Sequence, residues 1–130
     1  MALVVLDASV VIAFLDARDP KHEAALAVVA TLAGDTLVLP ASAFAEVLVG
    51  AFRRDRTAAA EVERFISDAG IRIEPLTPDI ARRAAELRAR HRSLRLADAL
   101  VLATGEHIEA RMIVTADRAW RGLVARVRVI

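Results

Sequence analysis

The feature that most constrains the fold is a repeated alternation between short β-branched apolar runs and longer alanine-rich segments. Short apolar runs are typical of buried strands, and they occur at residues 3–6, 36–39, 71–73, 112–115 and 127–130. The segments between them have helical periodicity, over about 9–16, 20–33, 40–52, 57–70, 77–90 and 96–110, with a short helix expected after residue 117. Strands that alternate with helices predict an α/β fold, here one domain over residues 1–130 with a mostly parallel central sheet covered on both faces.

Local signals set the expected helix ends. Ser9 and Thr57 are expected to cap the helices that follow them, and Thr77 stands before a proline at the start of another. Gly34 and Gly70 are expected to end helices.

Four acidic residues lie inside apolar runs or directly after them. Asp7 and Asp117 follow predicted strands, whereas Glu46 and Asp98 interrupt predicted apolar helices. A carboxylate in apolar surroundings is costly unless it is paired, hydrogen-bonded or bound to a cation. In a parallel sheet, ligands bind beyond the carboxyl ends of the strands, which is where Asp7 and Asp117 are expected. The four acids therefore predict one pocket for a hard divalent metal such as Mg²⁺ or Mn²⁺.

Each acid alone also has an ordinary structural explanation. Asp7 and Asp117 could cap the helices after them, and Glu46 could be a solvent-exposed glutamate paired with a neighbour. Asp98 in a first helical turn could interact with the helix dipole, although this does not account for the apolar face around it. Acids that converge on one pocket stay ionised together only with cations. A bound metal would in turn supply an activated water for phosphodiester hydrolysis without any side-chain nucleophile.

Composition narrows the possible classes. The chain has no cysteine, which excludes disulfides, thiolate zinc sites and cysteine nucleophiles and fits a reducing cytosol, so we expect a cytoplasmic protein. No apolar run approaches the roughly 18 residues needed to cross a bilayer, and no signal peptide is evident. We therefore expect no membrane partner.

Charge is unevenly distributed along the chain. Residues 1–80 hold 7 basic and 12 acidic groups, and residues 81–130 hold 11 basic and 5 acidic groups. Of the 18 basic residues 17 are arginine, whose planar fork suits phosphate, although genomic base composition is an equal explanation. Five arginines flank two of the acids and are the candidates for contacts with phosphate groups, the alternative for each being a solvated helix end: Arg90, Arg92, Arg95, Arg118 and Arg121.

Three segments resemble the motifs of one family. Residues 6–10, 95–100 and 114–117 resemble, in order, the opening, central and final motifs of PIN-domain nucleases, and Glu46 stands where such chains carry a glutamate. The length and the motif order are similar to those of VapC toxins from bacterial toxin–antitoxin pairs, and the resemblance covers essentially the whole chain.

The resemblance implies a PIN-like three-layer α/β/α sandwich and an endoribonuclease that depends on one or two Mg²⁺ or Mn²⁺ ions. Asp7 and Asp98 would bind metal directly, Asp117 directly or through water, and Glu46 would orient water or a second ion. Ser9 and Thr115 would hold the carboxylates in place. The implied partners are RNA, a second copy of the chain in a homodimer, and a small VapB-like antitoxin whose tail blocks the pocket.

Two other functions remain open. A Mg²⁺-dependent phosphoryl-transfer domain also gathers acids at strand ends, but an aspartyl phosphatase would need an acid where Ser9 stands, and a receiver domain would need a lysine near the site, whereas the only lysine is Lys21. A non-catalytic RNA- or protein-binding module predicts a broken set of acids, and all four are present.

Overall fold

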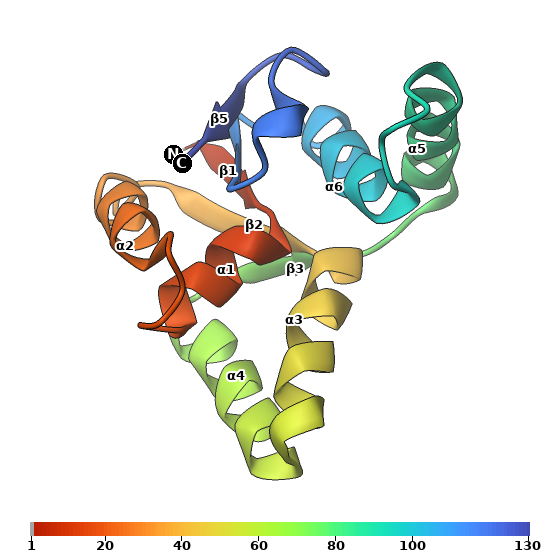
Figure 1. Ribbon diagram of the computed structural model, residues 1–130. Helices are drawn as coiled ribbons and strands as arrows, with labels where there is room; N and C mark the ends of the chain where they lie inside the picture. Colours follow the sequence, from red (N-terminus) through yellow and green to blue (C-terminus); the bar gives the residue numbers. More distant parts are fainter. Residues whose placement is uncertain (1) are drawn as a thin grey trace.

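The computed structural model describes residues 2–130 and has a five-stranded sheet with helices on both faces (Figure 1). The strands are β1 (Leu3–Leu6), β2 (Thr36–Pro40), β3 (Arg72–Glu74), β4 (Met112–Thr115) and β5 (Val127–Val129). The helices are α1 (Ala8–Leu15), α2 (His22–Ala30), α3 (Ala41–Arg54), α4 (Arg56–Asp68), α5 (Pro78–Arg90), α6 (Leu96–His107) and a short 3₁₀ helix, η1 (Arg118–Trp120). The α/β prediction is confirmed.

Strand order places β1 at the centre of the sheet. The order is β3-β2-β1-β4-β5, and every neighbouring pair is parallel. Val5 of β1 lies opposite Val38 on one side and Ile113 on the other. The chain first builds outward from β1 through β2 to β3, and then crosses back to β4 on the opposite side of β1. This reversal between β1 and β4 is the kind of switch point at which α/β sheets open a crevice for ligands.

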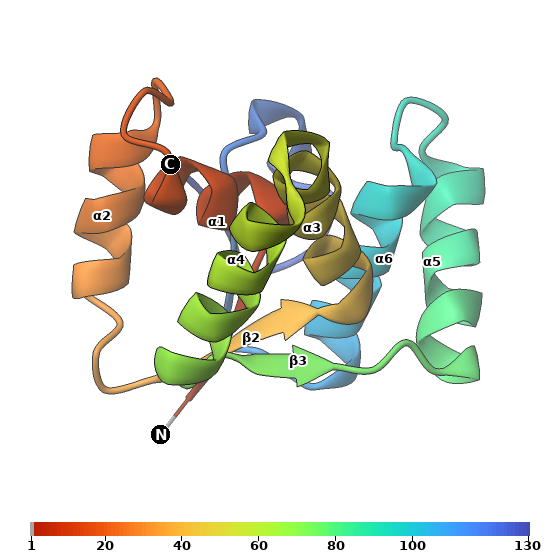
Figure 2. The ribbon, with the colours of Figure 1, turned by 90° about the horizontal axis from the view of Figure 1, so that it is seen from below.

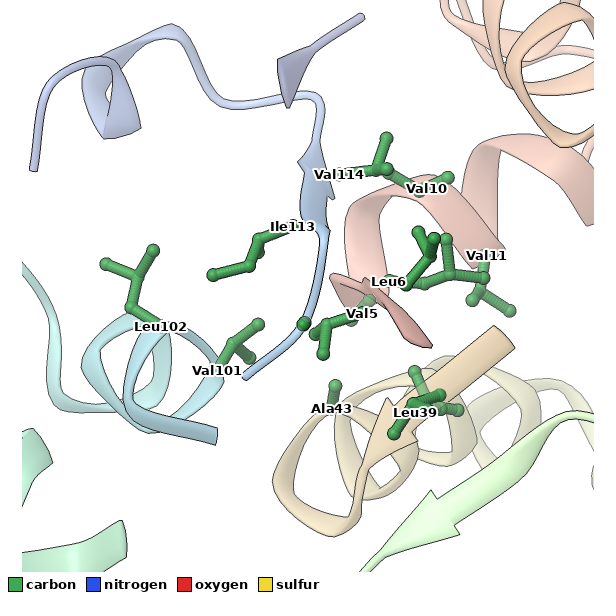
Figure 3. Close-up of a cluster of buried hydrophobic side chains, with 14 of the residues drawn as sticks. Val5, Leu6, Val10, Val11, Leu39, Ala43, Val101, Leu102, Ile113 and Val114 are labelled. Carbon is green, nitrogen blue, oxygen red and sulfur yellow. The ribbon is translucent and has the colours of Figure 1, made fainter. Parts of the chain in front are cut away.

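Side chains of the central strands alternate between the two faces. Figure 3 shows Val5 and Ile113 pointing toward Leu102 of α6, whereas Leu6 and Val114 point toward α1. The period of two along a strand produces this alternation, and both sets are buried because helices cover both faces. Figure 2 shows α1, α2 and α4 on one side of the sheet and α5 and α6 on the other. Helices on both faces of the sheet thus explain why the central strands are apolar at successive positions.

Helix α3 has a different position from the covering helices. It begins directly after β2 and contacts both α1 and α6. It therefore lies near the carboxyl edge of the sheet rather than flat on either face (Figure 1). Glu46, in its second turn, is brought to the same edge as the ends of β1 and β4.

Close packing of α6 on the sheet depends on a glycine. A Cβ at Gly105 would lie 2.6 Å from Cγ1 of the buried Ile113, well inside contact distance. Any larger residue would push α6 away from β4. The same helix carries Asp98 in its first turn, so the packing of α6 on the sheet helps to position that carboxylate.

Several predicted helix ends were wrong. Helix α1 begins at Ala8, so Ser9 is already helical and does not cap it. The cap of α4 is Asp55, which accepts from the Ala58 N–H at 2.7 Å, rather than Thr57. Helix α2 ends at Ala30, before Gly34, because the Thr31 hydroxyl and N–H both bond to the Val28 carbonyl and turn the chain.

Other boundary signals held. Thr77 caps α5 by accepting from the Ile80 N–H at 3.3 Å. Gly70 ends α4 with a φ of +69°, a conformation that glycine adopts without strain. No helix within residues 2–130 is long and apolar enough to cross a membrane.

Candidate active site

Two of the four acids flank the switch point of the sheet. Asp7 directly follows β1, and its N–H donates to the carbonyl of Val114 in β4 at 2.9 Å. Asp117 lies two residues beyond the end of β4. Both acids therefore reach the crevice at the carboxyl edge, as the polarity of adjacent parallel strands requires.

The Asp7 carboxylate is held by a network that joins β1 to β4. The hydroxyls of Ser9 and Thr115 both donate to Asp7 Oδ2, at 2.6 and 3.0 Å. The same hydroxyls accept in turn, Ser9 from the Ala116 N–H at 3.1 Å and Thr115 from the Asp117 N–H at 3.0 Å. Asp7 therefore has one oxygen fixed by two hydroxyls, while the loop that carries Asp117 is anchored to the same network.

Burial makes ionisation of Asp7 unfavourable. The residue is only 6% exposed, and desolvation raises its pKa above the usual value. The Ser9 and Thr115 hydrogen bonds oppose this rise, whereas repulsion from Asp98 adds to it. Asp7 makes no side-chain capping bond to α1, so the helix-cap explanation does not account for this acid.

Asp98 lies in the first turn of α6 and is paired with an arginine. It is 7% exposed. Arg95 donates from Nε to Oδ2 and from Nη2 to Oδ1, both at 3.1 Å, so the guanidinium engages both carboxylate oxygens. This two-bond fork is a strong, directional form of ion pair. It raises the pKa of Arg95, mainly through the hydrogen bond to Asp98.

Glu46 and Asp117 are exposed, and their surroundings differ. Partial burial of the Glu46 carboxyl raises its pKa, and repulsion from Asp7 and Asp98 raises it further. Asp117 Oδ1 accepts from the Ala119 N–H at 2.9 Å, so this acid does cap η1, as one interpretation of the sequence proposed. A cap uses only one of the two carboxylate oxygens.

The four acids share one electrostatic environment. Asp7 and Asp98 repel each other, and both repel Glu46. Arg95 is attracted to Asp98, Glu46 and Asp117. Asp7, Glu46 and Asp98 therefore lie within Coulombic reach of one another, and Asp117 is linked to them through Arg95. Arg95 is thus the shared cation of Asp98, Glu46 and Asp117, and Asp7 joins this set through its repulsion with Asp98 and Glu46.

The donor set fits a hard divalent cation. It contains carboxylate and hydroxyl oxygens and no histidine or cysteine, the chemistry that suits Mg²⁺ or Mn²⁺. Burial chiefly raises the pKa values of Asp7 and Glu46, and repulsion from neighbouring acids adds to the rise; a bound cation would offset both effects. Within residues 2–130, however, no three acidic, histidine or cysteine side chains are already gathered around one ion-sized point. The acids are neighbours, and Arg95 holds both oxygens of one of them.

The predicted phosphate-binding arginines lie on segments that flank the acids. Arg92 and Arg95 belong to the loop before α6, and Arg118 and Arg121 to η1 and its end. Residues of both segments line a pocket of about 50 Å³ together with Asp98 and Asp117. All five predicted arginines are exposed, the fifth being Arg90 at the end of α5. Their contact with RNA stays a prediction.

Trp120 lies beside the acidic site, a position that the sequence did not predict. It lines the same pocket, yet it is only 1% exposed. In the described part of the chain its Nε1 is the one buried side-chain nitrogen or oxygen without a hydrogen-bond partner. Trp120 is therefore packed in the core, and η1 is the element that buries it beside Asp98 and Asp117.

Comparison with known proteins gives the family. The model of the PIN domain family matches residues 4–124. No curated protein matches the sequence. Solved structures do share the fold at low identity. The VapC20 toxin of Mycobacterium tuberculosis, described as cleaving the sarcin–ricin loop, is 21% identical, with a TM-score of 0.77 over 93% of this chain and 96% of that one.

Two further structures are toxin–antitoxin assemblies. A toxin–antitoxin complex from Klebsiella pneumoniae matches with 21% identity and a TM-score of 0.81, over 97% of this chain and 96% of that one. VapBC-1 of nontypeable Haemophilus influenzae matches with 15% identity and a TM-score of 0.75, over 98% and 97%. These likenesses establish the same fold, and the family model spans nearly all of the chain. The protein therefore belongs to the PIN-domain family.

Proposed function

We propose that this protein is a divalent-metal-dependent endoribonuclease and the toxin of a toxin–antitoxin pair. The observation that carries the nuclease proposal is the placement of Asp7 and Asp98. Two buried carboxylates, one directly after β1 and one in α6, repel each other at the switch point of the sheet, with Glu46 and Asp117 nearby. A fold that only needed stability would not keep this arrangement, because buried like charges destabilise it. Membership of the PIN-domain family supports the same conclusion.

The proposed metal ligands are Asp7 and Asp98, with Asp117 contributing directly or through water. A bound Mg²⁺ or Mn²⁺ would supply a water of lowered pKa and would neutralise charge on the attacked phosphodiester. Ser9 and Thr115 fix one Asp7 oxygen and thereby the direction of the other. Glu46, whose pKa is raised, is suited to hold or accept a proton from water at the edge of the site.

The arginines would position the RNA. Arg92, Arg118 and Arg121 are exposed beside the two acids and would follow a phosphate backbone, whereas Arg95 is exposed but has its guanidinium paired with Asp98. An arginine fork binds a phosphate through two hydrogen bonds at once. These contacts would place the scissile phosphate over the acidic cluster.

The direct test is RNA cleavage by purified protein freed of any partner. A pool of structured and messenger RNAs is incubated with Mg²⁺, with Mn²⁺ or with a chelator. Asp7→Asn and Asp98→Asn should each slow cutting strongly. Asp79→Asn, an exposed acid of α5 that pairs with Arg82 at 3.2 Å, removes the same charge outside the site and should cut as the parent does.

Some outcomes would reject the nuclease proposal. Cleavage that persists in the chelator would exclude metal dependence. Cutting by Asp7→Asn and Asp98→Asn at the parent rate would exclude the acidic cluster as the site. A partner-free protein that binds RNA but cuts nothing with either ion would favour a non-catalytic binding module.

The protein-partner part of the proposal has separate support. Among the described residues, Ile12 and Leu15 of α1 and Val49 and Phe52 of α3 are exposed large hydrophobic side chains, and α1 and α3 contact each other. Exposed apolar surface of this kind is typical of protein interfaces. The complexes among the similar structures are toxin–antitoxin assemblies. Light scattering should give twice the chain mass for the protein alone and a larger mass with a cognate antitoxin; a monomer that binds no antitoxin would contradict this part.

A further inference from the structure

The ion pair between Arg95 and Asp98 is unequal in burial. The Asp98 side chain is 10% exposed, whereas that of Arg95 is 72% exposed. Arg95 stands at the N-cap position of α6 but makes no capping bond, so its side chain contributes nothing to the start of the helix beyond the pair. Burying a carboxylate is costly unless it has a partner, and the fork from Arg95 supplies one. The fork therefore joins a buried acid to a cation that solvent reaches.

The fork lies where a metal ion would have to bind. Both oxygens of Asp98 accept from Arg95. A divalent cation on the same carboxylate would be repelled by the guanidinium, because two cations would then share one anion. The same guanidinium is attracted to Glu46 and Asp117, so it is the shared cation of three of the four acids. The engagement of Asp98 by Arg95 also fits the finding that no three acids in the described residues are gathered around one point.

We propose that Arg95 is a built-in counter-ion of the acidic site, which holds Asp98 in the metal-free protein and is displaced when a divalent cation binds. The inference rests on the proposed metal-dependent function. Displacement moves a long, exposed side chain into solvent and leaves Asp98 free to bind the ion. The released guanidinium is then available at the mouth of the site, where a phosphate of the substrate offers it a new two-bond partner. Arg95 is thus a positioning residue that exchanges one anion for another.

The measurement is the affinity for Mn²⁺ in the absence of RNA. Trp120 provides the signal, because it is the single tryptophan, the chain has no tyrosine, and it lines the pocket with Asp98 and Asp117. Mn²⁺ bound there should quench its fluorescence, and calorimetry supplies an independent Kd. If Arg95 competes with the ion, Arg95→Gln should bind Mn²⁺ about three- to tenfold more tightly than the parent.

Two variants separate competition from a general effect of charge. Arg82→Gln removes the same charge and breaks an ion pair of the same spacing, between Arg82 and Asp79 on α5, so its Kd should stay within about twofold of the parent's. Arg95→Lys keeps the charge but loses the planar fork, so a competing fork predicts partial tightening. A purely long-range effect predicts no change in the lysine variant.

RNA cleavage at saturating Mn²⁺ gives a second readout of opposite sign. Arg95→Gln should raise the KM for RNA even as it tightens the metal, because the released arginine would no longer meet the phosphate. Circular dichroism would confirm that the variant folds. A Mn²⁺ Kd in Arg95→Gln equal to or weaker than the parent's would overturn the proposal, as would equal tightening in Arg82→Gln.

Failure of the underlying function would look different. If neither the parent nor Arg95→Gln binds Mn²⁺ or cuts RNA, the proposed metal site itself is wrong and the counter-ion role falls with it. If the parent binds Mn²⁺ and cuts RNA but the Kd for Mn²⁺ is the same in Arg95→Gln, the nuclease proposal is retained and only the counter-ion role is refuted.

Discussion

Replacing Thr115 by valine isolates the network that fixes Asp7. Thr115 is fully buried, and valine has nearly the same shape, so the change leaves no cavity. It removes one hydrogen bond to the Asp7 carboxylate, at 3.0 Å, and one from the Asp117 N–H, also at 3.0 Å. A hydrogen bond to a charged group contributes about 1.5–3 kcal/mol, and an orphaned N–H that is partly buried adds a cost of about 1 kcal/mol. We expect Thr115→Val to lower the free energy of unfolding by about 2–4 kcal/mol near neutral pH.

The size of this loss should depend on pH, with a sign fixed by Asp7. Burial already raises the Asp7 pKa above 3.8, and the Thr115 hydroxyl opposes that rise. Without the hydroxyl the pKa rises further, so the ionised form is favoured less in the folded variant than in the folded parent. The loss should therefore be smallest in acid, where Asp7 is protonated in both proteins. It should grow as pH increases through the raised pKa values.

Thr104→Val is the matched control for this experiment. Thr104 is also buried, but its hydroxyl donates at 2.7 Å to the Leu100 carbonyl within α6, an uncharged acceptor. Its loss should cost about 1 kcal/mol or less, without pH dependence. Urea unfolding of the metal-free proteins at about pH 4 and about pH 7 measures both variants. Equal costs for the two variants, or a Thr115→Val cost that does not change with pH, would refute the account of the Asp7 network.

Three further substitutions have definite expected outcomes. Asp7→Asn should melt at a higher temperature than the metal-free parent near neutral pH, because the raised pKa of Asp7 means that its charge destabilises the fold. In calorimetric scans at lower pH the difference in melting temperature should vanish. A difference that grew in acid would contradict this reasoning. Gly105→Ala should lose about 1–2 kcal/mol in urea unfolding, because the added methyl group meets Ile113. Gly50→Ala, on the exposed surface of α3 with nothing within 4 Å, should instead gain about 0.5–1 kcal/mol, and a gain in both glycine variants would refute the close-packing argument for α6.

The fold class could be predicted from the sequence because the burial of strands between helices determines both the packing and the hydrophobic pattern. Strands covered on both faces must be apolar at every position, and helices between them must be amphipathic, so the alternation of runs specifies a parallel α/β sheet. Asp7 and Asp117 were placed correctly because parallel strands end at the same edge. The strand order, by contrast, depends on the direction in which the chain crosses the sheet after β3, and the apolar runs in the sequence do not predict that direction.

The parts that sequence reasoning missed are decided by tertiary contacts. Thr57 and Asp55 are both good capping residues. Asp55 is the one that caps α4, because its backbone is extended where the chain passes from α3 to α4. Ser9 looked like a cap, yet its hydroxyl turns to Asp7 because that carboxylate is buried beside it. The spacing of Arg95 and Asp98 did permit an ion pair at the start of α6. A free phosphate partner was equally compatible with the sequence, so only the structure shows which anion the arginine meets.

The central claim is that the acids act as one site, and the rate of RNA cleavage in a double-variant cycle tests it most directly. Asp7→Asn, Asp98→Asn and the combined variant are compared with the parent in saturating Mg²⁺, with Asp79→Asn as the control for lost charge. Residues that act as a unit are strongly non-additive, so the double variant should cut no more slowly than the worse single variant. Single variants that cut at the parent rate, or effects that simply multiply in the double variant, would contradict a shared metal site.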